Sequence, residues 1–254
     1  MGEIALQQSD AEIRGFQHDR RMMLTDREGN FMSQRKYPGM ARFSLSLTSD
    51  GFRISHKGEE LVIPHILPLK KPGPVTIWND RLQAPEAEGP FSEWFSDHLK
   101  MPCRLIVMDG QTQRPVKRKY SVHDENVSFA DSLPYLILGS ASLDDLNRRL
   151  DIPVPMDRFR PNLVISTEEP FYEDGLDLFR IGGAVFKKMK PCSRCIITTI
   201  DQTTGERGDE PLKTLSGYRK DGNKVIFGQN LVCLKEGIVK TGDELDFSVN
   251  SADL

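Results

Sequence analysis

Short segments that alternate apolar and polar side chains recur along this chain, and they constrain its fold more than any other feature. Residues 22–34 and 41–55 each contain two such segments around a turn, at residues 26–30 and 48–51. Alternation with period two buries one face of a strand, and Gly-Asn and Asp-Gly pairs favour tight turns. Each region therefore predicts a β-hairpin, and two hairpins in succession indicate a β-meander or a barrel.

The rest of the chain continues this pattern with little helix. Further strands are predicted at residues 75–78, 103–108, 134–138, 162–166, 178–181, 184–188, 196–201, 225–227, 231–234 and 245–249. Short helices are predicted at residues 90–99 and 142–150, the second capped by Ser142 with acidic residues in its first turn and arginines in its last. Residues 110–127 are mostly polar and basic and predict a surface loop. The fold class predicted is mainly β, an α+β protein with a few short helices.

Length and charge limit the classes of function. A chain of 254 residues can bury the core of one large domain or of two intimate ones. A net charge of −3 and a pI near 6.0 provide no general attraction to nucleic acid. The sequence shows no apolar run of membrane-spanning length and no signal-like start, so we expect a cytoplasmic protein without membrane partners. Its four cysteines are then expected to remain free thiols.

Residues 187–201 concentrate the reactive side chains. They contain three lysines, Arg194, and two of the four cysteines, Cys192 and Cys195, followed by a β-branched run that predicts a buried strand at residues 196–201. Cationic neighbours favour the thiolate, the form that attacks electrophiles and binds soft metals. This local basicity in an acidic chain also points to a small anionic ligand.

Three interpretations of the Cys-x-x-Cys spacing compete. A dithiol redox pair normally opens a helix after a strand, whereas a strand is predicted directly after Cys195. A structural zinc site needs two further ligands, and Cys103 and Cys233 are isolated in the sequence while the five histidines are scattered. Burial as small hydrophobic side chains suits Cys103 and Cys233, which lie in apolar strands, but explains neither the lysines nor Arg194 beside the other two.

Four ordered motifs carry a resemblance to a known family. They lie at residues 156–165, 192–201, 210–215 and 227–230. In their order and spacing the chain resembles the MOSC family, the domain found at the C-terminus of molybdenum cofactor sulfurase, and most closely its amidoxime-reducing branch. His18-Asp19-Arg20-Arg21 through Ser33-Gln34-Arg35 resembles the N-terminal β-barrel domain that accompanies MOSC in that branch. The resemblance implies a MOSC N-terminal β-barrel-like domain at residues 1–110 and a MOSC β-barrel domain at residues 111–254.

The resemblance also implies a cofactor and the residues that hold it. The cofactor is molybdenum-molybdopterin, with Cys195 as the protein ligand of the metal and the catalytic residue. The residues that match cofactor-binding positions are Arg20, Asp131, Arg160, Asn162, Ser193 and Arg194. Arginine in fork geometry suits a phosphate, and thiolate suits a soft metal, so the residue types agree with these roles. We expect the cofactor to lie between the two domains.

The function implied is molybdenum-dependent reduction of small N-oxygenated substrates, such as amidoximes and N-hydroxylated bases. The chain lacks the cysteine spacing of a plant-type iron-sulfur domain, so its electrons are expected from a separate electron-transfer protein. The alternative is a carrier or binding module that holds the molybdenum cofactor or a sulfur cargo on Cys195 without turnover. In the amidoxime-reducing branch a Pro-x-Lys-Ser strand precedes the position of Ile4. The chain begins too late to contain it, from which we expect a shortened N-terminus at Met1-Gly2 and weaker cofactor binding.

Overall fold

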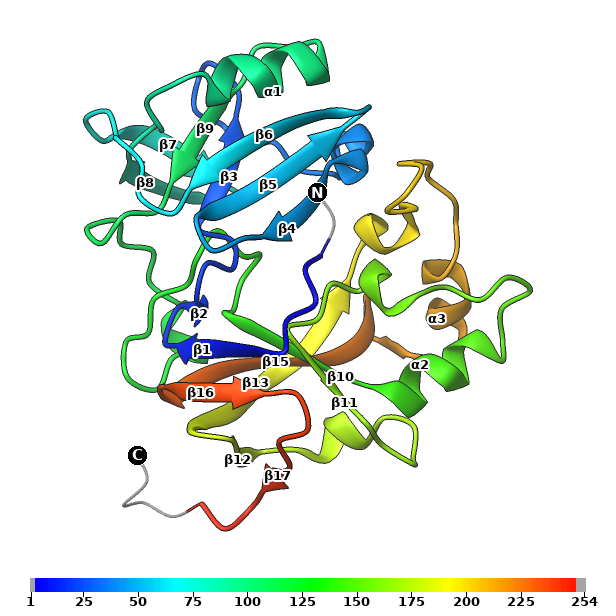
Figure 1. Ribbon diagram of the computed structural model, residues 1–254. Coiled ribbons are helices and arrows are strands. Elements are labelled where there is room, and N and C mark those ends of the chain that lie inside the picture. Colours follow the sequence, from blue (N-terminus) through cyan, green and yellow to red (C-terminus); the bar gives the residue numbers. More distant parts are fainter. Residues whose placement is uncertain (1–2, 250–254) are drawn as a thin grey trace. The chain divides into compact units, whose positions relative to one another are not determined.

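A computed structural model describes residues 3–249 (Figure 1); the Met1-Gly2 start lies outside them. The chain forms two compact units, each assembled from separate segments. Unit 1 comprises residues 3–4, Arg20–Arg114 and Ile200–Arg207. Unit 2 comprises Ala5–Asp19, Pro115–Thr199 and residues 208–249. Each unit therefore contains residues that lie far apart in the sequence.

Unit 1 is built from three small antiparallel sheets and one helix. The sheets have the strand orders β3-β9, β4-β5-β6 and β7-β8. The strands are β3 (Met22–Thr25), β4 (Ser44–Leu47), β5 (Gly51–His56), β6 (Glu59–Pro64), β7 (Gly73–Ile77), β8 (Asp80–Ala84) and β9 (Arg104–Val107). Helix α1 spans Phe91–Leu99, and a 3₁₀ helix spans Pro38–Arg42. The hairpin predicted at residues 41–55 is confirmed as β4-β5, whereas residues 31–34 form only an isolated bridge, between Phe31 and Thr25.

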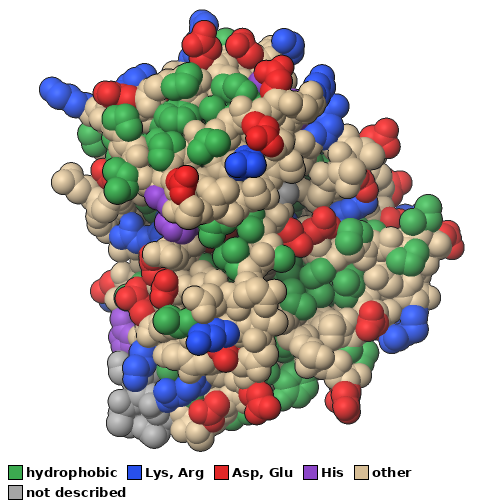
Figure 2. Space-filling model, in the orientation of Figure 1, with side chains coloured by type: hydrophobic (Ala, Val, Ile, Leu, Met, Phe, Trp, Pro, Cys, Tyr) green, Lys and Arg blue, Asp and Glu red, His purple; other side chains and the backbone are tan. Residues whose placement is uncertain are grey.

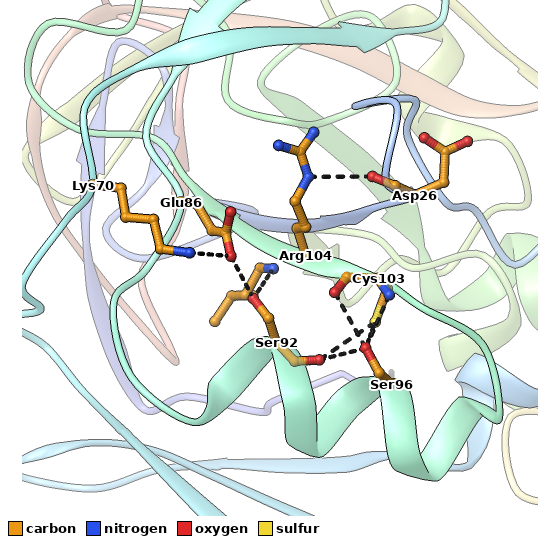
Figure 3. A network of polar contacts seen from close by, with 8 residues as sticks. Asp26, Lys70, Glu86, Ser92, Ser96, Cys103 and Arg104 are labelled. Carbon is orange, nitrogen blue, oxygen red and sulfur yellow. Dashed lines mark hydrogen bonds and ion pairs between the residues drawn. The ribbon is translucent and has the colours of Figure 1, made fainter.

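Helix α1 and strand β9 are joined by serine hydroxyls as well as by apolar packing (Figure 3). Ser96 accepts a hydrogen bond from the Cys103 amide at 2.9 Å and donates one to the Ser92 carbonyl at 2.6 Å. Ser92 accepts from the Leu105 amide at 3.1 Å and donates to Glu86 at 3.0 Å. These bonds satisfy polar groups at the start of β9 while Phe91 and Phe95 bury the apolar face of the helix.

A buried histidine makes unit 1 sensitive to acid. His56 on β5 is 4% exposed, and its ring stacks on Phe43 with the centroids 4.3 Å apart. Burial, assisted by the charge of nearby His98, lowers the pKa of His56 below its ordinary 6.5.

The unfolded chain then binds the proton first as the pH falls, so stability should decline below about pH 6.5. Urea unfolding at about pH 7.5 and about pH 5 measures this loss, and His56→Phe, which cannot titrate, should reduce it. An equal pH-dependent loss in the native chain and the variant would assign the acid sensitivity to other groups.

Unit 2 is organised around a long curved sheet. Its strands follow the order β11-β10-β15-β13-β12-β17, with β14 beside β15, and a second sheet has the order β16-β1-β2. The strands are β1 (Gln8–Glu12), β2 (Gly15–Phe16), β10 (Tyr135–Gly139), β11 (Leu163–Ile165), β12 (Leu178–Ile181), β13 (Ala184–Arg194), β14 (Lys220–Asp221), β15 (Lys224–Lys235), β16 (Gly237–Lys240) and β17 (Leu245–Asp246). Helices α2 (Ser140–Asn147) and α3 (Leu212–Tyr218) complete the unit.

Strands β13 and β15 are the longest strands in the described part of the chain, and they pair with each other (Figure 1). The register shifts at Val185/Phe186, Lys188/Lys190 and Pro191/Ser193. Such bulges bend a strand and re-aim its side chains, and they are frequent beside functional sites. The two shifts closest to the end of β13 therefore distort the stretch that leads into Cys192.

The fold class predicted from the sequence, mainly β with a few helices, is confirmed. The capping role predicted for Ser142 is wrong. Gly139 precedes α2, and Ser142 lies inside it, where its hydroxyl accepts from the Phe171 amide at 2.7 Å and donates to buried Glu173 at 2.9 Å. The first turn contains no acidic residue, and Asp145 instead pairs with Arg149 at 3.0 Å. Tertiary partners, which the local sequence does not reveal, determine the roles of these side chains.

On the face drawn in Figure 2, Lys and Arg side chains are interspersed with Asp and Glu. Nothing on that face resembles an extended basic surface for nucleic acid. Within residues 3–249, no helix combines the length and the apolar character needed to cross a membrane.

Candidate functional site

Cys195 lies where β13 ends and a 3₁₀ helix at Ile196–Thr199 begins. Its carbonyl oxygen accepts hydrogen bonds from the Thr198 amide at 3.1 Å and from the Thr198 hydroxyl at 3.0 Å. The thiol is half-buried. These contacts fix the backbone of Cys195 without using its sulfur, which remains available to a ligand.

The strand predicted at residues 196–201 is therefore wrong. The β-branched run favours a strand, but threonine hydroxyls can also bond to a carbonyl three residues earlier and stabilise a tight turn. Thr199 makes such a bond to the Ile196 carbonyl at 2.9 Å, as Thr198 does to Cys195. Two consecutive threonines with this local alternative outweigh the strand preference of the isoleucines.

Arg194 connects the cysteine segment to a second part of the site. Its Nη1 lies 3.0 Å from the sulfur of Cys192, and its Nη2 donates to the Phe159 carbonyl at 2.7 Å. Its guanidinium carbon lies 5.3 Å from the centroid of the Phe159 ring. The Nε atom is buried and has no hydrogen-bond partner among the described residues. Arg194 thus fixes the position of Phe159, the residue before Arg160, and one donor remains for a ligand.

The extended backbone separates the two cysteines. Residues 192–194 belong to β13, so the Cα atoms of Cys192 and Cys195 lie about 10 Å apart at strand rise. A disulfide needs Cα atoms within about 7 Å, and both thiols are free. A 3₁₀ helix, and not the predicted strand, follows Cys195, but the strand geometry within the motif still disfavours a dithiol pair.

The lysines before Cys192 do not all gather around its thiol, contrary to the expectation from their spacing. Lys187 pairs with Asp177 at 3.4 Å, and Lys188 donates to the Asp174 carbonyl at 2.6 Å. The cationic contact to Cys192 comes from Arg194 instead. Alternation along a strand, which a count of charges within a window ignores, directs these side chains to different neighbours.

Two arginines predicted to contact the cofactor, Arg20 and Arg160, share an uncommon backbone conformation. Arg20 has φ = 51° and Arg160 has φ = 55°, both in the left-handed region. This region costs a residue with a Cβ atom about 1–2 kcal/mol and is uncommon outside glycine, asparagine and aspartate. Strained backbone that is retained at an arginine is a pointer to function. Both side chains are half-buried.

Asn162 connects two segments of the chain through its side-chain amide. Its Oδ1 accepts from the Leu136 amide at 3.1 Å, and its Nδ2 donates to Asp19 at 2.9 Å. Asp19 directly precedes Arg20, so this bond restrains the backbone that leads into that arginine. Sequence reasoning missed Asp19, and its place inside the His18-Asp19-Arg20-Arg21 motif was the only available signal. A contact of Asn162 with a cofactor stays a prediction.

The remaining candidate residues, Ser193 and Asp131, are exposed, whereas the other two cysteines are buried. Ser193 is exposed on β13, and Asp131 is exposed in the segment before β10. Cys103 and Cys233 are buried at 4% and 1% exposure, as expected for structural thiols. Burial raises the pKa of Cys103, and it raises that of Cys233 to about 12. Neither of these two thiols is suited to bind a metal as thiolate.

The donor set fits a metal that brings most of its own ligands. Among the described residues, no three His, Cys, Asp or Glu side chains form a group that could hold a bare ion. The half-buried thiol of Cys195 offers one soft ligand, and Arg194, the residue before it, has a buried Nε–H without a partner among the described residues that can donate to an anionic group. A dithiolene-bound molybdenum needs only that one thiolate from the protein, so these residues fit the cofactor that the resemblance implies.

Comparisons with known proteins agree in both halves of the chain. Residues 124–246 match the MOSC domain, and residues 1–102 match the MOSC N-terminal beta barrel domain. The mitochondrial amidoxime-reducing component 1 of Homo sapiens is 34% identical over 245 residues, which are 89% of this chain and 71% of that protein. The Mus musculus protein of that name is 32% identical over 90% and 72% of the two chains.

A molybdenum cofactor sulfurase of Solanum lycopersicum is 30% identical over 84% of this chain and 29% of its own length. The crystal structure of YiiM from Geobacillus stearothermophilus aligns over 71% of this chain with 15% identity and a TM-score of 0.35, too low to support an argument. Two family matches that together span both halves, and relatives above 30% identity over most of their length, agree with the motifs found in the sequence. The chain belongs to the MOSC domain family, with a MOSC N-terminal beta barrel domain before the MOSC domain.

Proposed function

We propose that this protein is a molybdenum-cofactor-dependent oxidoreductase that reduces N-oxygenated substrates such as amidoximes and N-hydroxylated bases. The observation that carries the proposal is the half-buried thiol of Cys195, whose backbone is anchored through its carbonyl oxygen, in a described part of the chain where no three His, Cys, Asp or Glu side chains form a group for a bare metal ion. The relatives named amidoxime-reducing component and molybdenum cofactor sulfurase support a function related to the molybdenum cofactor. The choice of N-oxygenated compounds as substrates is our proposal.

We propose a role for each candidate residue. Cys195 supplies the thiolate, and Arg160, whose backbone is left-handed, supplies a guanidinium fork for the cofactor phosphate. Arg20 is proposed as a further cofactor-binding residue. Arg194 positions the Phe159–Arg160 turn through its 2.7 Å bond and offers its buried Nε to the cofactor. Asn162, Ser193 and Asp131 complete the proposed cofactor contacts.

When bound, the molybdenum centre supplies two-electron chemistry at oxygen. In the overall reaction the N–O bond of the substrate breaks, two electrons and two protons are consumed, and the oxygen leaves as water. In this proposal the electrons come from a separate electron-transfer protein. A cytoplasmic location remains part of the proposal.

A cofactor or sulfur carrier is the second candidate. The sulfurase relative favours it, because 84% of this chain aligns within 29% of that longer protein. The same thiol and the same arginines would then hold the cofactor or a sulfur atom without turnover.

Elemental analysis and turnover separate these candidates. The chain is produced in a host that synthesises the molybdenum cofactor, and its molybdenum content is measured per folded molecule. Activity with an amidoxime is then followed using a reduced dye as electron donor. Bound molybdenum with turnover supports the oxidoreductase, bound molybdenum without turnover supports the carrier, and absence of bound molybdenum contradicts both molybdenum proposals.

A further inference from the structure

Three lysines surround Tyr120 beside the cysteine segment. Tyr120 ends a 3₁₀ turn at Arg118–Tyr120, within the basic loop predicted at residues 110–127. The Nζ atom of Lys190 lies 4.3 Å from the centroid of the Tyr120 ring, and the Nζ atom of Lys119 lies 4.8 Å from it. Lys224, the first residue of β15, is close enough to act on the ionisation of both Lys190 and Tyr120. We call these four residues the lysine cluster.

The ammonium group of Lys190 has no hydrogen-bonded carboxylate among the described residues. Lys190 is half-buried, and among the described residues it makes no hydrogen bond or ion pair. Burial lowers the pKa of Lys190; Tyr120 and Cys192 oppose this shift, and the charges of Lys224 and Lys119 add to it. A hydrogen bond to Lys119 and the three ammonium charges lower the pKa of Tyr120. A bound oxyanion would therefore stabilise the ammonium form of Lys190.

The other two lysines on β13, unlike Lys190, have acidic or carbonyl partners. Lys187 has Asp177 as its partner, and Lys188 has the Asp174 carbonyl. Three like charges around one ring, in a chain with net charge −3, therefore mark a specific local arrangement rather than a generally basic surface.

The lysine cluster lies along the segment that leads to the proposed metal ligand. Lys190 precedes Cys192 by two residues on β13, between two of its register shifts. On the neighbouring strand Val225 pairs with Arg194, so Lys224 is one position from the partner of the residue before Cys195. Lys190 and Lys224 thus lie on the two paired strands that contain the cysteine segment and its partner residues.

We propose that the lysine cluster binds an oxyanion, a carboxylate or a phosphate, carried by the substrate of the Cys195 site. The substrate class is then an N-oxygenated compound with an anionic group. The reaction at Cys195 rests on the proposed function, whereas the anion site does not. Because Lys190 is half-buried against an aromatic ring, a compact oxyanion reaches it more readily than a broad acidic surface.

Binding of inorganic phosphate tests the anion site without any turnover. Calorimetry is performed in a chain carrying Arg160→Gln, which removes the predicted contact with the cofactor phosphate. Adding Lys190→Gln should weaken phosphate binding about tenfold, the effect of losing one charged contact. Adding Lys187→Gln, which removes the same charge from the same strand outside the cluster, should leave it within about twofold. Equal phosphate affinity of the Lys190→Gln and Lys187→Gln chains would overturn the anion site. So would a failure of the chain with Arg160→Gln alone to bind phosphate.

Turnover by the cofactor-loaded protein tests the substrate assignment. An aromatic amidoxime is compared with the same amidoxime carrying a ring carboxylate. Lys190→Gln should raise KM about tenfold for the carboxylate and leave KM for the neutral compound unchanged. Phosphate binding that depends on Lys190 without this difference in KM would refute the substrate assignment. If the native chain reduces neither compound while phosphate binding still depends on Lys190, the proposed function fails and the anion site is supported.

Discussion

A Cys195→Ser chain should contain almost no molybdenum when it is purified from a host that makes the cofactor. Serine keeps the size of the side chain and the backbone contacts of the 3₁₀ turn, but its hydroxyl is a poor ligand for a soft metal. The loss should exceed the roughly 10–100-fold effects typical of groups that only support a metal ligand. Metal analysis per folded molecule measures it, with thermal unfolding as the check that the fold is intact.

Cys192→Ser is the matched control, since it makes the same atomic change three residues earlier. A serine hydroxyl can still accept the hydrogen bond that Arg194 now directs at the Cys192 sulfur at 3.0 Å. Most of the molybdenum should therefore remain. Equal losses from the two substitutions would mean that both sulfurs act together and that Cys195 is not the sole ligand.

The second large loss of cofactor is expected from substitution of Arg160, whose backbone is in the left-handed region. Arg160→Gly removes the guanidinium fork and relieves the backbone at φ = 55°, whereas Arg160→Ala removes the fork and keeps the strain. Cofactor content should fall in both variants by about tenfold or more, as expected for the loss of charged contacts to a phosphate.

Stability should separate these two variants. The free energy of unfolding of the Arg160→Gly chain should exceed that of the Arg160→Ala chain by about 1 kcal/mol, because glycine adopts the left-handed conformation at no steric cost. Urea unfolding measures this difference. Full cofactor retention in the glycine variant would show that Arg160 serves the backbone of its turn and not the ligand.

The alternation of side chains was enough to predict most of the strands, because burial of one face leaves a pattern that any reader of the sequence can find. Strand β12 spans the predicted residues 178–181, and α1 lies within the predicted residues 90–99. Residues 225–227 and 231–234 were predicted as separate strands and form one, β15. Gly228 and the polar pair Gln229-Asn230 interrupt the apolar pattern there, but both polar side chains are buried within the sheet.

The site could be predicted less well than the fold. Motifs indicate which residues belong to it, but the partners of those residues lie elsewhere in the sequence. Asn162 bonds to Leu136 and Asp19, and Arg194 bonds to the Phe159 carbonyl. Such contacts span up to 143 residues of sequence, and no local pattern encodes them. Residue propensities likewise do not predict the left-handed backbone of Arg20 and Arg160, because they assign that conformation to glycine or asparagine.

The segment Ile200–Arg207 has a consequence for how the protein is made. It belongs to unit 1, where Arg207 donates to the Arg35 carbonyl at 2.6 Å, although unit 2 supplies the residues on both sides of it. During translation Arg20–Arg114 leaves the ribosome before most of unit 2, and domains usually fold as they emerge, N-terminal part first. Unit 1 must then wait for a piece that leaves the ribosome only after Pro115–Thr199. Neither unit can be completed by the nascent chain alone until residue 207 is free, so a stall before that point leaves both unfinished.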